Sequence, residues 1–317
     1  MKAIVLDSDG LTYRSEWPEP VPKPGEVIVD VLQAGICETD LQLARGYMGF
    51  SGVLGHEFVG IAQSGLYAGQ RVVGEINCYC RDCPMCRDGL MNHCPNRTVV
   101  GIDRHDGAFA ERLAIPEFCL HAVPDAISND HAVLTEPLAA AFQIGEQINL
   151  SQCASALVLG DGRLSLLIAQ VLKHSVGRLI VIGKHAGKLS RFEERGIPTV
   201  GLAQFEPRKE FDLVVEVTGS PSGLPLALQC VRPRGTVVMK TTVANDHQLP
   251  MAALVIDEIQ LVGSRCGPFD KALKSLCEDG LQLDDFVTHR FTLAEAENAM
   301  QKASEPQALK VVFDIGS

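Results

Sequence analysis

Four cysteines in one short stretch are the densest set of metal-binding side chains in the sequence. Cys80, Cys83, Cys86 and Cys94 follow the spacing C-x2-C-x2-C-x7-C. Short loops bring successive thiolates to one side of a turn, and four thiolates form the closed tetrahedral shell of a structural zinc site. We therefore predict one structural Zn²⁺ here. The alternatives are an iron–sulfur site or unpaired loop cysteines, and Cys78 just upstream is either a spare ligand or a free thiol.

A second set of metal-binding residue types is scattered along the first half of the chain. Gly35–Asp40 reads G-I-C-E-T-D, Gly55–Gly60 reads G-H-E-F-V-G, and Thr135–Pro137 reads T-E-P. Together they supply one cysteine, one histidine and a carboxylate. Zinc held by three protein ligands keeps a fourth position open, which is the basis of Lewis-acid catalysis. The combination indicates a catalytic zinc site, whereas each motif alone would more often be structural.

A glycine-rich turn follows the apolar run Ala156–Leu159 and opens the helical stretch Leu164–Leu172. The turn reads G-D-G-R-L-S from Gly160 to Ser165. The first glycine permits a tight turn, the second lets the backbone approach a pyrophosphate, and Ser165 is a small residue where helix and strand must pack closely. The helix N-terminus then faces the phosphates. This context predicts a dinucleotide site, although an ordinary strand–helix turn would share part of the pattern.

The form of the nucleotide depends on the end of the next apolar run, Leu179–Ile182. NAD usually requires an acid there for the ribose 2′-hydroxyl, but Gly183-Lys184-His185 follows. A small residue leaves room for a 2′-phosphate, and Lys184 offers it positive charge, with Arg191 nearby in sequence. The sequence therefore favours NADP over NAD. The alternative is a solvated basic turn.

The elements divide the chain into two regimes. Up to about residue 140 short β-like runs such as Glu26–Leu32 and Arg71–Val73 alternate with Gly and Pro, which indicates an irregular β-rich domain. From Ser155 apolar strands alternate with helices, which predicts a doubly wound parallel sheet of the Rossmann type. The later predicted strands are Phe211–Val217, Gly235–Met239 and Glu258–Val262. The tail contains the predicted helices Phe269–Glu278 and Leu293–Ala303 and a closing strand, Lys310–Ile315. We expect an α/β protein with a catalytic domain at 1–142, completed by 266–317, and a dinucleotide-binding domain at 143–265.

The order of these motifs resembles that of zinc-containing medium-chain dehydrogenases/reductases, the alcohol dehydrogenase family. G-x-C-x-T-D, G-H-E-x-x-G-x-x-x-x-G from Gly55 to Gly65, the cysteine stretch, T-E-P and the glycine turn all follow in sequence. The likeness is greatest to the polyol and threonine dehydrogenase branch. It implies a chaperonin-10-like β domain, a Rossmann domain, and hydride transfer between a polyol or secondary alcohol and NAD(P), which gives a ketone or aldehyde.

The resemblance assigns catalytic roles to the residues that match the motifs of the family. It implies that Cys37 and His56 bind zinc, and that Glu57 or Glu136 adds the carboxylate directly or through water. Asp40 would hold the imidazole of His56 in its metal-binding tautomer. The Thr39 hydroxyl would meet the alcohol, although Thr39 and Asp40 together also suit a helix N-cap.

Nucleotide contacts are implied at the ends of the strands in the second domain. The predicted cofactor-binding residues are Gly160, Gly162, Arg163, Leu164, Gly183, Lys184, His185, Thr218 and Arg265. Two departures from the family leave the proton route and the substrate open. Gln42 stands where some alcohol dehydrogenases have a relay histidine, and the segments 44–54 and 63–71 are short.

Composition limits the classes of partner. The chain has 317 residues, 46% hydrophobic and 21% charged, with a net charge of -11, which suits about two domains and disfavours nucleic acid and membranes as partners. We expect a cytoplasmic protein, because we find neither a signal peptide nor an apolar run of transmembrane length. A small-molecule substrate, two zinc ions and a homodimer or homotetramer complete the expectation. The alternatives are a zinc-free enone or quinone reductase and a non-catalytic zinc- and nucleotide-binding protein.

Overall fold

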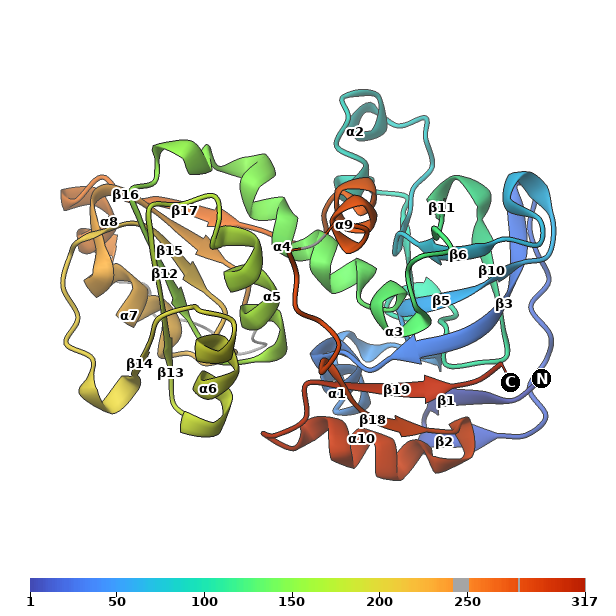
Figure 1. The fold of residues 1–317 in the computed structure, drawn as a ribbon. Helices are drawn as coiled ribbons and strands as arrows, with labels where there is room; N and C mark the ends of the chain where they lie inside the picture. The colour runs from blue at the N-terminus through green and yellow to red at the C-terminus, as the bar shows by residue number, and fades with distance from the viewer. Residues whose placement is uncertain (242–250, 279, 317) are drawn as a thin grey trace. The chain divides into compact units, whose positions relative to one another are not determined.

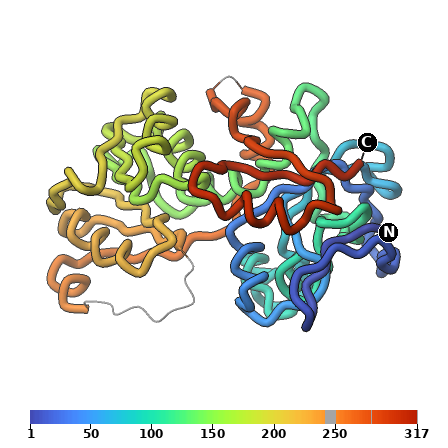
Figure 2. The backbone as a smooth tube through the Cα atoms, turned by 90° about the horizontal axis from the view of Figure 1, so that it is seen from below, coloured from blue at the N-terminus to red at the C-terminus, as the bar shows by residue number. Residues whose placement is uncertain are grey.

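The computed structural model describes residues 1–241, 251–278 and 280–316. The chain forms two compact units: unit 1 comprises Met1–Glu136 and Phe269–Ser317, and unit 2 comprises Pro137–Pro268. Residues 242–250, 279 and 317, which the predicted domain ranges include, lie outside the described residues. Both chain ends belong to unit 1 (Figure 2), so this unit is assembled from two stretches that are far apart in sequence.

Unit 2 is built on a six-stranded parallel sheet with the order β14-β13-β12-β15-β16-β17. Every residue of the central strand β12 is buried, as expected for a strand covered on both faces. The strands are β12 (Ser155–Leu159), β13 (Arg178–Gly183), β14 (Thr199–Gly201), β15 (Phe211–Glu216), β16 (Val231–Met239) and β17 (Gln260–Gly263). The predicted doubly wound parallel sheet is confirmed, with β14 in addition to the predicted strands.

Helices connect these strands on both faces of the sheet (Figure 1). Because parallel crossovers are right-handed, the reversal of strand order at β12 puts α5 and α6 on one face and α7 and α8 on the other. The helices are α5 (Arg163–Leu172), α6 (Ala186–Glu194), α7 (Gly223–Cys230) and α8 (Met251–Ile256), and α4 (Thr135–Gln147) leads in from unit 1. Ligands of such sheets bind at the carboxyl ends of the strands beside this switch point, where the glycine turn lies.

The main sheet of unit 1 has the order β11-β6-β5-β3-β19-β18, and β10 also pairs with β3. Strand β19 runs antiparallel to β3 with Val312 opposite Gly35, so residues near positions 35 and 312 meet in one sheet. Along β3 buried and half-buried residues alternate, because only one face of the strand meets the core. The strands are β3 (Glu26–Gly35), β5 (Glu57–Ala62), β6 (Arg71–Gly74), β10 (Arg112–Pro116), β11 (Leu120–Ala122), β18 (Val287–Phe291) and β19 (Lys310–Asp314).

Smaller elements complete unit 1. Two three-stranded sheets consist of β1 (Ala3–Asp7), β2 (Gly10–Arg14) and β4 (Gly52–Val53), and of β7 (Asn77–Cys78), β8 (Thr98–Val100) and β9 (Arg104–His105). The α-helices are α1 (Glu38–Ala44), α2 (Pro84–Arg87), α3 (Asn129–Ala132), α9 (Phe269–Leu276) and α10 (Ala296–Ser304). The 3-10 turns are η1 (Tyr47–Gly49), η2 (Gly65–Tyr67), η3 (Met91–His93), η4 (Glu117–Cys119) and η7 (Leu293–Glu295) in unit 1, and η5 (Leu150–Gln152) and η6 (Leu202–Gln204) in unit 2.

One predicted helix differs in detail. The stretch Leu293–Ala303 was expected to be a single helix, but it begins as the turn η7 before α10. A capping box fixes this start, since the carboxylate of Glu295 accepts a hydrogen bond of 2.9 Å from the backbone N–H of Thr292. No helix in the described part of the chain is both long enough and apolar enough to cross a membrane.

Candidate active site and metal centres

The four clustered cysteines meet at one point in unit 1. The Sγ–Sγ distances are 3.5 Å from Cys83 to Cys86, 3.7 Å from Cys83 to Cys94, 3.5 Å from Cys94 to Cys80 and 4.0 Å from Cys80 to Cys86. A tetrahedron of thiolates with Zn–S bonds of about 2.3 Å has edges of roughly 3.8 Å. The spacing of the four sulfur atoms therefore fits a single closed zinc site.

Backbone and side-chain N–H groups stabilise the thiolates of Cys80, Cys83, Cys86 and Cys94, which we call the cysteine lobe. The N–H of Cys80 lies 3.5 Å from Sγ of Cys94, and that of Cys83 lies 3.4 Å from Sγ of Cys80. The backbone N–H of Asp82 and the amide of Asn96 lower the pKa of Cys80 to about 6. This shift favours the thiolate form of Cys80, which is the form that binds zinc.

Cys78 lies outside the four-cysteine group among the described residues. Its side chain is buried on β7, where a hydrogen bond from Cys119 lowers the pKa of Cys78 to about 6 against the effect of burial, and His105 acts in the same direction. The geometry therefore favours the interpretation of Cys78 as a free thiol rather than as a competing ligand.

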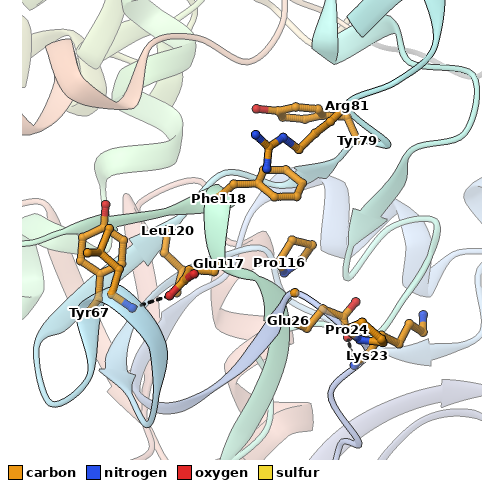
Figure 3. A pocket seen from close by; sticks show the side chains of 12 residues that line it. Lys23, Pro24, Glu26, Tyr67, Tyr79, Arg81, Pro116, Glu117, Phe118 and Leu120 are labelled. Carbon is orange, nitrogen blue, oxygen red and sulfur yellow. Dashed lines mark hydrogen bonds between the residues drawn. The ribbon is translucent and has the colours of Figure 1, made fainter.

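A hollow of about 600 Å³ lies beside the cysteine lobe in unit 1 (Figure 3). The guanidinium of Arg81 lies 5.2 Å from the ring centroid of Phe118, and Tyr79 contacts the same ring at 4.8 Å between centroids. These contacts attach the segment next to Cys80 to η4. None of the predicted site residues lines the hollow.

The second metal-binding group forms where β3 and β5 pair. Gly35 lies opposite Glu57 in this pairing, Cys37 is the N-cap of α1 just after β3, and His56 precedes β5. The potential ligand atoms of Cys37, His56 and Glu57 all lie within 4.8 Å of one another. Antiparallel pairing thus brings together residues that are scattered in sequence. Glu136, the alternative carboxylate, does not belong to this group within the described residues.

The residues of this group fit a zinc ion. Glu57 is 1% exposed, and its Oε1 atom has no hydrogen-bond partner among the described residues. A buried carboxylate oxygen without a partner is costly unless another ligand satisfies it. The other oxygen, Oε2, pairs with the buried ammonium of Lys310, which also donates to the carbonyl of Ile36 at 3.3 Å. A thiolate, an imidazole and a carboxylate form a donor set that zinc accepts with a fourth position open.

Asp40 positions the histidine. Its Oδ1 atom lies 3.2 Å from Nδ1 of His56, and its Oδ2 atom accepts a hydrogen bond of 2.8 Å from the backbone N–H of Cys37. Burial opposes protonation of His56, but the Asp40 carboxylate outweighs it and raises the pKa of His56 well above its ordinary value. Binding of a metal ion to this imidazole therefore competes with binding of a proton.

Three further residues that the sequence analysis singled out are Thr39, Glu136 and Gln42. The hydroxyl oxygen of Thr39 is 3.9 Å from Sγ of Cys37, so Thr39 adjoins one of the potential metal ligands. Glu136 lies in the first turn of α4, where it is half-buried. The amide of Gln42 binds the carboxylate of Glu38 at 2.9 Å, and this accounts for Gln42 without a role in proton relay.

The glycine turn of unit 2 has the geometry of a phosphate-binding turn. Gly160 has a φ angle of 128°, and a Cβ atom there would lie 2.6 Å from the carbonyl of Val217. A Cβ atom on Gly162 would meet nothing within 4 Å, so this side of the turn is open. Ser165 is fully buried as helix α5 begins at Arg163, with Leu164 in its first turn.

The remaining predicted nucleotide contacts follow the other strands of the same sheet. Thr218 follows β15, where its hydroxyl and backbone N–H bind Glu216, and Arg265 follows β17. Gly183, at the end of β13, and the next two residues approach Asp161 of the glycine turn. Sequence reasoning missed Asp161 and Lys310. The available signals were a charged residue inside a glycine turn and a lysine directly before the apolar run Val311–Phe313.

Comparison with known proteins agrees with this architecture. Residues 23–125 match the family model of the Alcohol dehydrogenase GroES-like domain. Sorbitol dehydrogenase of Halalkalibacterium halodurans is 28% identical over 340 residues, covering 99% of each chain. A solved chain from Sinorhizobium meliloti 1021 bound to NADP superimposes with a TM-score of 0.89 at 26% identity, covering 99% of this chain and 98% of that one. An alcohol dehydrogenase of E. coli CFT073 complexed with NADH gives 0.90 at 25% identity, covering 99% of each chain.

The fold and the site define a two-unit dehydrogenase with a GroES-like unit and a Rossmann unit. In sequence and fold the chain is similar to zinc-containing medium-chain dehydrogenases/reductases, the alcohol dehydrogenase family that the order of its motifs indicates.

Proposed function

We propose that this protein is a zinc-dependent oxidoreductase that transfers a hydride between a polyol or secondary alcohol and a nicotinamide cofactor. The group of Cys37, His56 and Glu57 carries the proposal, because it offers three ligands and a buried carboxylate oxygen without a partner. The relatives are dehydrogenases of sugar alcohols and of threonine, which supports an alcohol substrate. Solved relatives hold either NADP or NADH, so membership of the family does not select the cofactor.

In this proposal unit 1 contributes the metal centres and unit 2 the nucleotide site. Cys37, His56 and Glu57 would hold the catalytic zinc, and the four clustered cysteines a structural one. When bound, the catalytic zinc acts as a Lewis acid that makes the alcohol oxygen more acidic. Asp40 would orient the imidazole of His56 through the ion pair at Nδ1, and Nε2 would then bind the metal.

Thr39 would move the hydroxyl proton. Its hydroxyl lies next to Cys37, and it can accept a proton from the alcohol while donating its own toward water. Glu136 remains a proposed residue of the surrounding shell that binds metal through water. The glycine turn and the N-terminus of α5 would bind the pyrophosphate with backbone N–H groups, and this orients the nicotinamide ring for transfer.

The decisive experiment measures the zinc content per chain, nucleotide binding and turnover on a panel of polyols and secondary alcohols. We expect about two zinc ions per chain in the wild type and about one in Cys37→Ser, together with loss of turnover. Thr39→Val is expected to keep both zinc ions and to lower kcat by about 100-fold or more, with Thr39→Ser restoring most of it. A single zinc ion that Cys37→Ser leaves unchanged would refute the catalytic site and favour a zinc-free reductase.

A further inference from the structure

The carboxylate of Asp161 takes an unexpected place at the carboxyl end of β13. Asp161 belongs to the glycine turn after β12, but it is only 8% exposed and reaches across to the neighbouring strand. Its Oδ2 atom accepts hydrogen bonds from the backbone N–H groups of Lys184 at 2.7 Å and His185 at 2.8 Å. The ring Nδ1 of His185 lies 3.0 Å from the same oxygen. The carboxylate therefore occupies the group of N–H donors that precedes helix α6.

The missing side chain of Gly183 makes this placement possible. A Cβ atom on Gly183 would lie 2.5 Å from Cβ and 2.7 Å from Oδ2 of Asp161. In NAD-binding sheets of this type, an acid about 20 residues after the glycine turn binds the ribose hydroxyl. Here Gly183 occupies that place in the sequence, and the Asp161 carboxylate fills the space into which its side chain would extend. A carboxylate therefore lies at the end of β13, although the residue at that position in the sequence is a glycine.

The charge distribution around Asp161 bears on the form of the nucleotide. Lys188 Nζ lies 3.9 Å from Oδ1, which accepts no hydrogen bond from any residue in the described ranges. The cationic groups that face the carboxylate are thus Lys188 and, when protonated, His185, whereas the side chain of Lys184 is exposed. A ribose 2′-phosphate at this end of β13 would meet a carboxylate and backbone donors that are already occupied.

We propose that Asp161 selects NAD(H) over NADP(H), with Oδ1 accepting a hydroxyl of the adenosine ribose and the negative charge rejecting a 2′-phosphate. This inference rests on the proposed function, which supplies the nucleotide. It reverses the preference for NADP that Lys184 and the absence of a neighbouring acid suggest in the sequence, because the structure supplies the acid from the preceding turn.

The test is calorimetric binding of ADP-ribose and of 2′-phospho-ADP-ribose, which requires no turnover. Wild type is expected to bind ADP-ribose at least tenfold more tightly than the 2′-phosphorylated probe, and Asp161→Asn is expected to reduce that ratio at least tenfold. Asp212→Asn is the matched control, because Asp212 also accepts a backbone N–H, that of Ser155, but at the opposite end of β12. The ratio of the affinities for the two probes in Asp212→Asn should remain that of the wild type.

A double variant that moves the acid from position 161 to position 183 separates the role of the carboxylate from a loss of stability in a single variant. Asp161→Gly should lose the preference, and Asp161→Gly combined with Gly183→Asp should restore it, because the acid returns to the end of β13. Equal or tighter binding of the 2′-phosphorylated probe by the wild type would overturn the assignment of Asp161 and leave the nucleotide site standing. Binding of neither probe by the wild type would refute the nucleotide site of the proposed function, and with it this inference.

Discussion

The two metal-binding groups of unit 1 use different chemistry in different surroundings. In the lobe the sulfur atoms of four cysteine pairs lie 3.5–4.0 Å apart, and Cys80 is exposed. In the other group a thiolate, an imidazole and a carboxylate meet, and His56 and Glu57 are 3% and 1% exposed. The first arrangement leaves no coordination position for a substrate, whereas the second leaves one.

The charge of each set of ligands explains why one group can lie near the surface and the other can be buried. Four thiolates around a divalent ion leave an excess of negative charge, which is tolerable near the surface because water solvates it. Cys37 and Glu57 would balance a divalent ion, and the remaining buried charges, those of Asp40 and Lys310, cancel each other. A metal site can therefore be buried and still keep an open position when its ligand set and its neighbours are neutral together.

The largest expected effect separates the two groups. Cys37→Ser should remove the catalytic zinc and lower kcat/KM by about 1,000-fold or more, because Lewis-acid stabilisation of several kcal/mol is lost. Cys83→Ser should remove the other zinc ion, lower the Tm and leave the turnover of the folded fraction nearly unchanged. Metal analysis and steady-state kinetics on both variants check this. Equal loss of turnover in both would contradict the division of roles.

The second prediction concerns the charge balance of the buried group. Lys310→Met should lower the free energy of unfolding by about 3–5 kcal/mol, because it leaves the Glu57 carboxylate buried without its partner. Lys302→Met removes an exposed ion pair with Glu305 and should cost about 1 kcal/mol at most. Urea denaturation measures both. Adding Glu57→Gln to Lys310→Met should recover much of the lost free energy of unfolding. A double variant as unstable as Lys310→Met alone would argue against the buried charge as the cause.

The smallest effect tests how Asp40 tunes His56. Asp40→Asn should weaken zinc binding about 10- to 100-fold at neutral pH. Because Asp40 raises the pKa of His56, protons compete with zinc in the wild type as the pH falls below that raised pKa, and in the variant this competition should begin at a lower pH. Competition with a chromophoric chelator between about pH 5 and 8 would reveal the shift. Glu75→Gln, which alters the partner of His121, should change neither property.

Local patterns carried most of what could be predicted from the sequence. The cysteine spacing and the glycine turn place their side chains through short loops, so residue type and spacing suffice. The contacts of Lys310 and Asp161 depend on which strands become neighbours. Lys310 meets Glu57 across 253 positions, and Asp161 meets Lys184 only because β13 pairs with β12. The preference for NADP depends on residues near Gly183 in the sequence, whereas the carboxylate of Asp161 comes from the turn after the adjacent strand β12.

The place of Lys310 after unit 2 in the sequence has a consequence for biosynthesis. Unit 2 is one continuous stretch that leaves the ribosome before β19, so it can fold while the sheet of unit 1 still lacks that strand. Until β19 is made, Glu57 has no ammonium partner, and Gln33–Gly35 of β3 lack their pairing with β19. A chain that stops before β19 would therefore display an incomplete sheet to chaperones and proteases, so assembly of the proposed catalytic centre has to wait for the synthesis of β19.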